Sequence, residues 1–510
     1  MTHPFMLAAV LAYFGLVFWV AHRTGRNATN EGFFVGNRSS PWPVVAFGMI
    51  GTTLSGVTFV SVPGSVGRDG FTYFQVVLGN FAGFLVTAFV LLPLYYRERV
   101  TSIYEVLETR LGRAAHRTGA TFFLLSRTLG ATARLYLVVA VLQAMLLEAY
   151  GVPFALTAFV IVALIVAYTF EGGVKTIVWT DLLQTTCMLA GLAIIVAVLL
   201  SRLGLGFGAS LATLDARGLS RLFSTDPMRA DYWLKQFVAG MFIAITMTGM
   251  DQELMQKNIS VRTLAGAQKN MATMAAILLA VVLAFLYLGG LLQLYAESAG
   301  IAARGDRLFP AVVMGALPAA VQLVFVIALV SALFPSADGA LAALTSSFCV
   351  DLLALRQRAD LDETAASRIR KRVHMAFAAI FLVLVLGFHA LGNPSMISVI
   401  LVVAAYTYGP LLGLFAFAML TRRRPRDRWV PVVAVAAPLA CYAVDHYQAA
   451  LFGSYRIGLE ILVLNGALTF AGLWLISARS LPLQPNLGTM PDDTGAFAPR
   501  RPDAGSSDGA

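Results

Sequence analysis

Three ionisable side chains stand inside long apolar stretches of this 510-residue chain. Asp338 lies in SALFPSADGALAALTSS, Asp181 follows GGVKTIVWT, and Arg134 lies in LLSRTLGATARLYLVVAVLQ. A charged side chain at the centre of a bilayer costs roughly 2.5–3.5 kcal/mol on insertion scales, so each is expected to have a partner or a role. Two converging carboxylates would bind a cation or share a proton, because like charges repel at short range. An arginine would hold a carboxylate through two parallel hydrogen bonds.

Arg134 has an arginine neighbour, Arg127, seven residues earlier on the same helical face. We expect Arg127 to extend to the nearer membrane surface, as long basic side chains do close to helix ends. Arg134 then remains the candidate, and its anion would be Asp181, Asp338 or the carboxylate of a bound molecule. Asp181 has a second interpretation as the cap of a helix start.

The proline before Asp338 leaves a backbone carbonyl without its helical hydrogen bond. Pro335 has no amide hydrogen, so the carbonyl of Ser331, four residues earlier, loses its helical partner. Ser336 adds a hydroxyl beside it, and a hard cation such as sodium prefers oxygen ligands of these two kinds. Alternatively, neighbouring hydroxyls satisfy a simple proline kink. A stripe of small residues shares this face and would allow close approach of another helix: Ala332, Ser336, Gly339, Ala343 and Ser347.

Two apolar stretches are expected to contain broken helices. Residues 44–64, VVAFGMIGTTLSGVTFVSVPG, and residues 239–252, AGMFIAITMTGMDQ, combine glycine with hydroxyl side chains. Such residues let a helix unwind and turn its freed backbone groups toward a polar cavity. Breaks at matching positions of two halves indicate inverted repeats with a binding site near the midplane. The alternative is that the glycines only permit close helix packing.

These side chains must be positioned by membrane-spanning helices. The chain is 58% hydrophobic and 13% charged, and about thirteen of its apolar runs are long enough to cross a bilayer. The sequence therefore predicts an all-α integral membrane protein. The predicted spans are 5–21, 43–66, 71–96, 118–148, 153–170, 180–201, 233–251, 266–294, 318–346, 374–391, 396–420, 430–447 and 457–477.

The net charge of +10 is interpreted as a topology signal, and no nucleic-acid partner is expected. Alternate loops hold arginine clusters, which predicts an outside N-terminus and a cytoplasmic C-terminus in a bacterial-type inner membrane. The longer loop at 202–232 also holds arginines, but long loops translocate with less regard to charge. Residues 1–480 form the predicted membrane domain, and residues 481–510, rich in Pro, Gly, Asp and Ser, a disordered cytoplasmic tail.

Four motifs resemble the sodium:solute symporter family. They are GMIGTTLSGVTFVSVPG at 48–64, GGVKTIVWTDLLQ at 172–184, GMDQELMQKNIS at 249–260 and DLL at 351–353, and the resemblance covers roughly residues 5–430. The resemblance implies a LeuT-type core of two inverted five-helix repeats, with one extra helix before it and two after it. The repeats would cover about 43–201 and 233–420.

The resemblance also implies two ion sites. The shared sodium site of the family maps onto Gly51, Leu54, Ala332, Pro335 and Ser336. This chain departs from the family pattern there, since Pro335 replaces the first of two adjacent hydroxyl residues. A second cation site would use Asp181 and Asp338. An aspartate replaces a hydroxyl at 338, so this second site is expected to hold either Na+ or a proton.

For the solute, the resemblance favours a small organic carboxylate or an amino acid. Arg134 matches an arginine that meets the substrate acid in carboxylate-carrying relatives. A sugar is disfavoured because Ala244 and Met247 offer no polar group where sugar carriers have one. The remaining polar candidates for the solute site are Thr53, Ser55, Thr58, Gln75 and Tyr406.

The predicted function is Na+-driven symport by alternating access, with the solute and membrane lipid as partners and no enzymatic activity. The first alternative is proton coupling through Asp181 and Asp338. An intramembrane hydrolase is a rival from another class, and these two acids would suit an aspartyl type. A serine type needs a Ser–His pair at membrane depth. A solute sensor would need a signalling domain, for which the segment after residue 480 is short. The histidines are expected in loops or near helix ends: His3, His22, His116, His374, His389 and His446.

Overall fold

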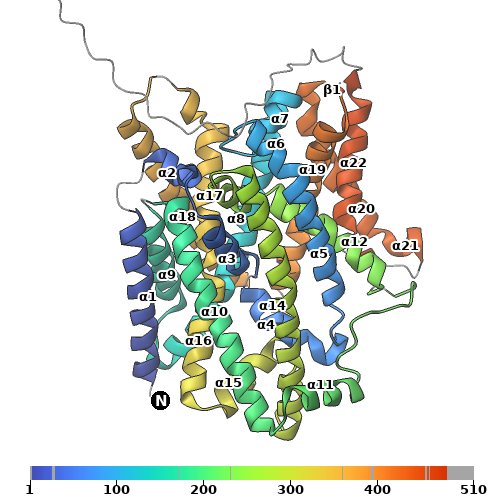
Figure 1. Cartoon of the computed structure of the whole chain (residues 1–510). Coiled ribbons are helices and arrows are strands. Elements are labelled where there is room, and N and C mark those ends of the chain that lie inside the picture. Colours follow the sequence, from blue (N-terminus) through green and yellow to red (C-terminus); the bar gives the residue numbers. More distant parts are fainter. Residues whose placement is uncertain are drawn as a thin grey trace, which may run out of the picture.

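The computed structural model describes nearly all of the chain up to residue 478 as one bundle of helices (Figure 1). The described ranges are 3–25, 29–54, 56–170, 172–229, 231–358, 360–391, 396–453, 457–458 and 460–478. Helices dominate because a backbone in lipid has to satisfy its hydrogen bonds within the segment that crosses. The predicted tail at 481–510 lies outside the described residues, as does Ser55.

Residues 3–203 contain ten α-helices in the part of the chain that the structure describes. They are α1 (His3–Gly25), α2 (Asn30–Val35), α3 (Trp42–Thr53), α4 (Gly56–Asp69), α5 (Phe74–Val86), α6 (Leu92–Arg97), α7 (Glu105–Arg110), α8 (Arg113–Leu142), α9 (Phe154–Thr169) and α10 (Val174–Leu203).

Residues 207–478 continue with α11 to α22 and one small strand pair. The elements are α11 (Phe207–Ala216), α12 (Trp233–Ala244), α13 (Gln252–Ile259), α14 (Leu264–Ser298), α15 (Leu308–Ala316), α16 (Ala319–Leu333), α17 (Pro335–Ser347), α18 (Glu363–Leu391), α19 (Met396–Leu420), β1 (Arg424–Pro425), α20 (Val430–His446), α21 (Gln448–Phe452), α22 (Ile461–Leu475) and β2 (Ser477–Ala478). β1 and β2 pair antiparallel.

Eight helical segments in the described residues are long and apolar enough to cross a membrane, or nine with the bent pair α3–α4. Three shorter apolar helices, Phe154–Thr169, Ala404–Leu420 and Ile461–Leu475, fall on further predicted spans. The multi-pass, all-α prediction is therefore confirmed. The number thirteen stays a prediction, because the shorter helices do not reach the length of a full span.

Both predicted helix breaks are present. α3 ends at Thr53, Leu54 leaves the helical region with φ −82° and ψ 85°, and α4 continues at an angle of 55°. In the second stretch, a π turn at Ile245–Gly249 ends α12. Asp251 is then extended, and its carboxylate accepts hydrogen bonds from the first amides of α13. These breaks expose backbone groups in the middle of the bundle, because a helix end leaves carbonyls and amides without intrahelical partners.

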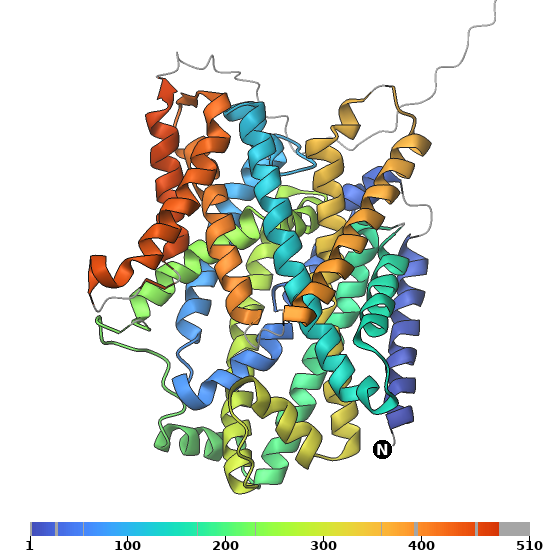
Figure 2. The ribbon, with the colours of Figure 1, turned by 180° about the vertical axis from the view of Figure 1, so that it is seen from behind.

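The broken helices lie at the centre of the bundle. α3 contacts α10, α13, α14, α16 and α17, whereas α1 packs at one edge and α20 with α22 at the other (Figure 1). In the view from behind, α8 runs through the bundle between α18 and α19, both of which it contacts (Figure 2). Every residue of α17 is buried, as the predicted stripe of small side chains requires. Two ends of the bundle are distinct: the start of α1 lies at one, and α6, α7 and β1 lie at the other (Figure 1).

One histidine differs from its predicted placement. α18 begins at Glu363, so His374 lies buried well inside this helix, whereas His116 lies in the first turn of α8, near a helix end as predicted. The His374 ring contacts the hydroxyls of Thr169 and Thr345, each at 3.0 Å, and His116 lies between two carboxylates. Neither ring has a serine hydroxyl as a hydrogen-bond partner within the described part of the chain, so a serine hydrolase gains no support.

Close packing of α5 and α12 generates a prediction about stability. A Cβ on Gly240 would overlap with the backbone carbonyl of Val76, which cannot move aside as a side chain could. We expect Gly240→Ala to lower the free energy of unfolding by about 1–3 kcal/mol, the usual cost of overpacking. Thermal unfolding of the purified protein in detergent measures this. Gly208→Ala is the matched control, since a Cβ there meets no atom within 4 Å. Equal unfolding temperatures for the two variants would contradict the packing.

Candidate functional site

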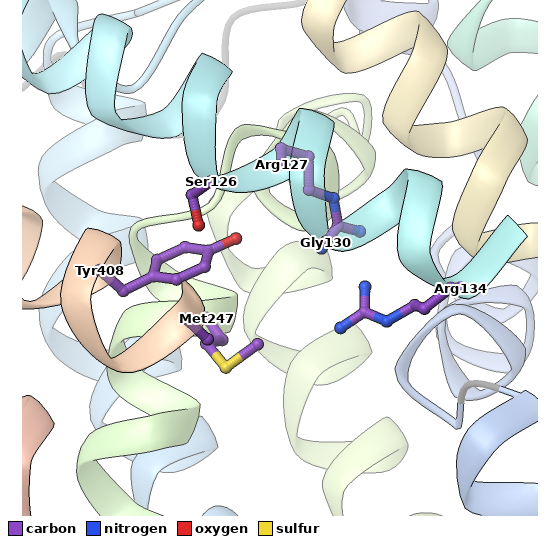
Figure 3. A pocket seen from close by; sticks show the side chains of 7 residues that line it. Ser126, Arg127, Gly130, Arg134, Met247 and Tyr408 are labelled. Atoms are coloured by element: carbon purple, nitrogen blue, oxygen red, sulfur yellow. The ribbon is translucent and has the colours of Figure 1, made fainter. Parts of the chain in front are cut away.

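A small pocket opens between α8, α19 and the π turn that ends α12 (Figure 3). The space between its lining side chains is about 230 Å³, a value that includes open solvent. The lining residues are Ser126, Arg127, Gly130 and Arg134 of α8, Met247 of the π turn, and Ala404 and Tyr408 of α19.

Arg134 is the cation of this pocket that lacks a counter-ion. Its half-buried guanidinium extends from α8 into the pocket (Figure 3). Among the described residues, Arg134 has neither a salt bridge within 4.0 Å nor a hydrogen bond to its side chain. A guanidinium in an apolar bundle is stabilised by an anion, and a carboxylate matches its paired donors. The predicted role of Arg134 toward an anionic solute is consistent with this placement and stays a prediction.

The observed position of Arg127 differs from the predicted one. Arg127 does not extend to the membrane surface, because its side chain is 5% exposed and held between two acids. The guanidinium pairs with Glu253 and lies 3.6 Å from an oxygen of Asp251, which also accepts a hydrogen bond of 2.6 Å from the Tyr408 hydroxyl. Both acids belong to GMDQELMQKNIS, at the start of α13. The helix break brings α13 back against α8, and the periodicity of α8 alone could not reveal that contact.

A second buried ion pair lies next to the first. The Lys257 ammonium lies 2.5 Å from Asp181 Oδ2 and 4.0 Å from Glu253 Oε1, and it donates a hydrogen bond of 2.7 Å to Thr52 Oγ1. Lys257 is 2% exposed and Asp181 is fully buried. Sequence analysis missed Lys257 and Glu253, although their i, i+4 spacing is the spacing of helical ion pairs. Residues Arg127, Glu253, Lys257 and Asp181 thus form a buried charge chain from the pocket to α3.

Asp338 has partners of its own. Its carboxylate accepts hydrogen bonds from the Tyr168 hydroxyl at 2.7 Å and from the Gly339 amide at 2.5 Å, and the side chain is fully buried. Asp181 and Asp338 lie on α10 and α17, which contact each other. Asp181 does not act as a helix cap, because α10 begins seven residues earlier at Val174. A cation or proton site at these two acids stays a prediction.

The residues of the expected sodium site lie on elements that meet. Gly51 and Leu54 are buried at the end of α3, whose last carbonyls have no intrahelical partner. α3 contacts α16 and α17, and Ala332, Pro335 and Ser336 lie buried where those two helices join. The helix continues past the proline, since the Asp338 amide reaches the Phe334 carbonyl at 3.1 Å. Carbonyl oxygens and a hydroxyl are the ligand types that sodium requires, so the donor set fits the ion.

The other predicted solute residues are not brought into the pocket. The Gln75 side chain is buried in hydrogen bonds to the backbone of Ser224, Asp231 and Thr72, which tie α5 to the 202–232 loop. The Tyr406 hydroxyl donates to Asp445 of α20 at 3.1 Å. These two assignments find no support.

Helical geometry explains why Tyr408 of α19, and not the predicted Tyr406, lines this pocket. Two residues along a helix correspond to a turn of about 200°, so Tyr408 faces the pocket where Tyr406 faces away. Thr53 and Thr58 lie half-buried on either side of the α3 break, and the Thr53 hydroxyl donates to the Met49 carbonyl at 2.8 Å. Ser55 lies outside the described residues.

Comparison with known proteins identifies the family of this chain. The sequence model of the sodium:solute symporter family matches residues 33–426. Sodium-coupled monocarboxylate transporter 1 of Mus musculus is 27% identical over 420 residues, which is 79% of this chain and 66% of that protein. The sodium-dependent multivitamin transporter of Oryctolagus cuniculus is 27% identical over 265 residues, 51% of this chain and 41% of that protein. The chain thus aligns with less than two-thirds of the length of these relatives.

The fold also has a solved counterpart. A Na+-coupled sialic acid symporter, in a substrate-bound outward-open state, shares a TM-score of 0.79 at 18% sequence identity, over 92% of this chain and 97% of that one. This likeness confirms the predicted LeuT-type fold. Since the family model covers both broken helices, the charge chain and the pocket, the chain is a multi-pass membrane protein that belongs to the sodium:solute symporter family.

Proposed function

We propose that this protein is a Na+-coupled symporter of a small solute that carries one carboxylate, working by alternating access. The observation that carries the proposal is the guanidinium of Arg134 in the pocket, which has no ion-pair partner among the described residues. Family membership and the sodium-coupled relatives support the coupling ion, and the relative named as a monocarboxylate transporter supports the solute class.

The charge balance of the pocket favours a monoanion. Arg127 is already paired with Asp251 and Glu253, so Arg134 contributes the remaining positive charge of the lining. A solute with one carboxylate would neutralise this charge. A doubly charged solute would bring a second negative charge toward the buried acids of α13, which like-charge repulsion opposes.

The remaining lining favours a short, mainly apolar body. Ser126 Oγ accepts a hydrogen bond of 2.7 Å from Thr407, which leaves its own proton for a solute oxygen. The Tyr408 hydroxyl is committed to Asp251. Gly130, Met247 and Ala404 present no polar side chain, so the several hydroxyls of a sugar would lose hydrogen bonds with water that the pocket could not replace.

In the proposed cycle, sodium is transported together with the solute. The ion would lie between the last carbonyls of α3 and the α16–α17 junction, with Gly51, Leu54, Ala332 and Ser336 as ligands and the carbonyl released by Pro335 nearby. A tenfold sodium gradient supplies about 1.4 kcal/mol. One sodium ion moving with one monoanion carries no net charge, so the membrane potential adds nothing and the gradient would support about tenfold accumulation.

The proposed orientation follows the arginine clusters. The end of the bundle with α6, α7 and β1 carries Arg97, Arg110 and Arg424, and it lies opposite the start of α1 (Figure 1). By the positive-inside rule this end is cytoplasmic. The N-terminus would then be outside and residues 481–510 inside, in the cell membrane.

Replacing the pocket cation tests the solute class. Arg134→Gln should weaken binding of two- to six-carbon monocarboxylates roughly ten- to hundredfold, because a hydrogen bond to a charged group contributes about 1.5–3 kcal/mol. Uptake of radiolabelled members of this panel into proteoliposomes measures the change in KM. Arg117→Gln is the control, since Arg117 is exposed on the same helix. Unchanged monocarboxylate uptake by Arg134→Gln would refute the carboxylate assignment.

Replacing a sodium ligand tests the coupling ion. Ser336→Ala should raise the sodium concentration for half-maximal uptake about tenfold or more, because it removes a hydroxyl ligand of a charged ion. The matched control is Ser331→Ala, on the same span, whose hydroxyl instead faces Tyr13 at 2.8 Å and whose carbonyl is kept. Uptake that ignores sodium and follows an imposed proton gradient would favour the proton-coupled alternative.

A further inference from the structure

We propose that the ammonium of Lys257 is a built-in cation that takes the place of a second sodium ion at Asp181, so that the protein binds one sodium ion per cycle. This inference rests on the proposed sodium coupling and specifies its stoichiometry. It replaces the expectation that Asp181 and Asp338 form a second station for a transported cation.

The contacts of Lys257 resemble those of a bound cation. Its ammonium touches a carboxylate oxygen of Asp181 at 2.5 Å and the hydroxyl of Thr52 at 2.7 Å, with Glu253 at 4.0 Å. These oxygens come from three separate elements, α10, α3 and α13. A sodium ion would use the same oxygen types, so the ammonium and an ion compete for one place.

The acids around Lys257 are buried, and they need positive charge beside them. Within the described residues, Asp181 Oδ1 and Glu253 Oε1 are buried oxygens without a hydrogen-bond partner. Buried carboxylates are costly when no cation compensates them. Lys257 meets this need permanently because it is covalently attached, whereas a sodium ion would have to be bound and released in every cycle.

The position of the ammonium also limits what can bind beside it. Thr52 stands between Gly51 and Leu54, the proposed ligands of the shared sodium site in the last turn of α3. A sodium ion at the shared site would therefore have the ammonium of Lys257 as a near neighbour across that turn. A further cation at Asp181 would have to share one carboxylate with Lys257, and repulsion between the two positive charges opposes this.

A purely structural ion pair is the competing explanation. Lys257 joins α13 to α3 and α10, and such a contact alone would hold the broken helices together. The two explanations differ in one measurable number. If the ammonium occupies a cation-binding site, removing it frees that site for sodium. If it only holds the helices together, removing it changes stability and leaves the number of bound sodium ions unchanged.

Equilibrium binding of ²²Na⁺ to the purified full-length chain gives this number without a solute. We expect one ion per wild-type protein with a Hill coefficient of about 1. Lys257→Gln should bind two ions with a Hill coefficient above 1, and Lys257→Arg should again bind one. Lys269→Gln is the matched control, because it removes an exposed ammonium from the neighbouring α14 and should also bind one.

Each outcome has a distinct meaning. Wild-type protein that binds no sodium would overturn the proposed function itself. Two ions on the wild-type protein, or one on a folded Lys257→Gln, would overturn the inference and leave sodium coupling standing. Should Lys257→Gln fail to elute as a monodisperse protein, the double variant Lys257→Gln/Asp181→Asn removes both charges and should bind one ion. No binding by a folded double variant would mean that Asp181 holds the transported ion, which also overturns the inference.

Discussion

Charge buried inside a lipid-embedded bundle is the constraint on which the centre of this protein depends. An ionised group there that water cannot reach needs a partner, since lipid cannot solvate it. The chain Arg127–Glu253–Lys257–Asp181 meets this need across α8, α13, α10 and, through Thr52, α3. Removing one member would leave its neighbour buried and uncompensated, which is far more costly than losing an exposed pair.

The same charge chain connects the proposed solute pocket with the proposed sodium site. At one end, Arg127 lines the pocket beside Arg134. At the other end, Lys257 reaches the last turn of α3, beside the proposed sodium ligands. Two sites joined by rigid, paired contacts can influence each other if the elements between them have two arrangements. The break before α13 and the break after α3 are the places where the backbone could change.

The family match and the packing describe the centre of the protein at two levels. The LeuT-type fold is shared with a solved Na+-coupled symporter. Within that fold, Pro335 lies at the α16–α17 junction, Asp338 accepts a hydrogen bond from Tyr168, and Lys257 pairs with Asp181. Under the proposed ion sites, Pro335 supplies no hydroxyl and Lys257 supplies a fixed charge, so the centre would hold fewer sodium ions.

The amino-acid sequence alone predicted the helical membrane fold and the breaks near Leu54 and Gly249, and it marked Arg134 and Asp181 as candidate site residues, because apolar length, glycine placement and charge in lipid are local properties of the chain. Which charges meet follows from the tertiary packing. It paired Arg127 with Glu253 and gave Lys257 to Asp181, and it turned Tyr408 rather than Tyr406 into the pocket. Partner choice depends on which helices lie side by side and how each is rotated, and neither is encoded in the spacing within one helix.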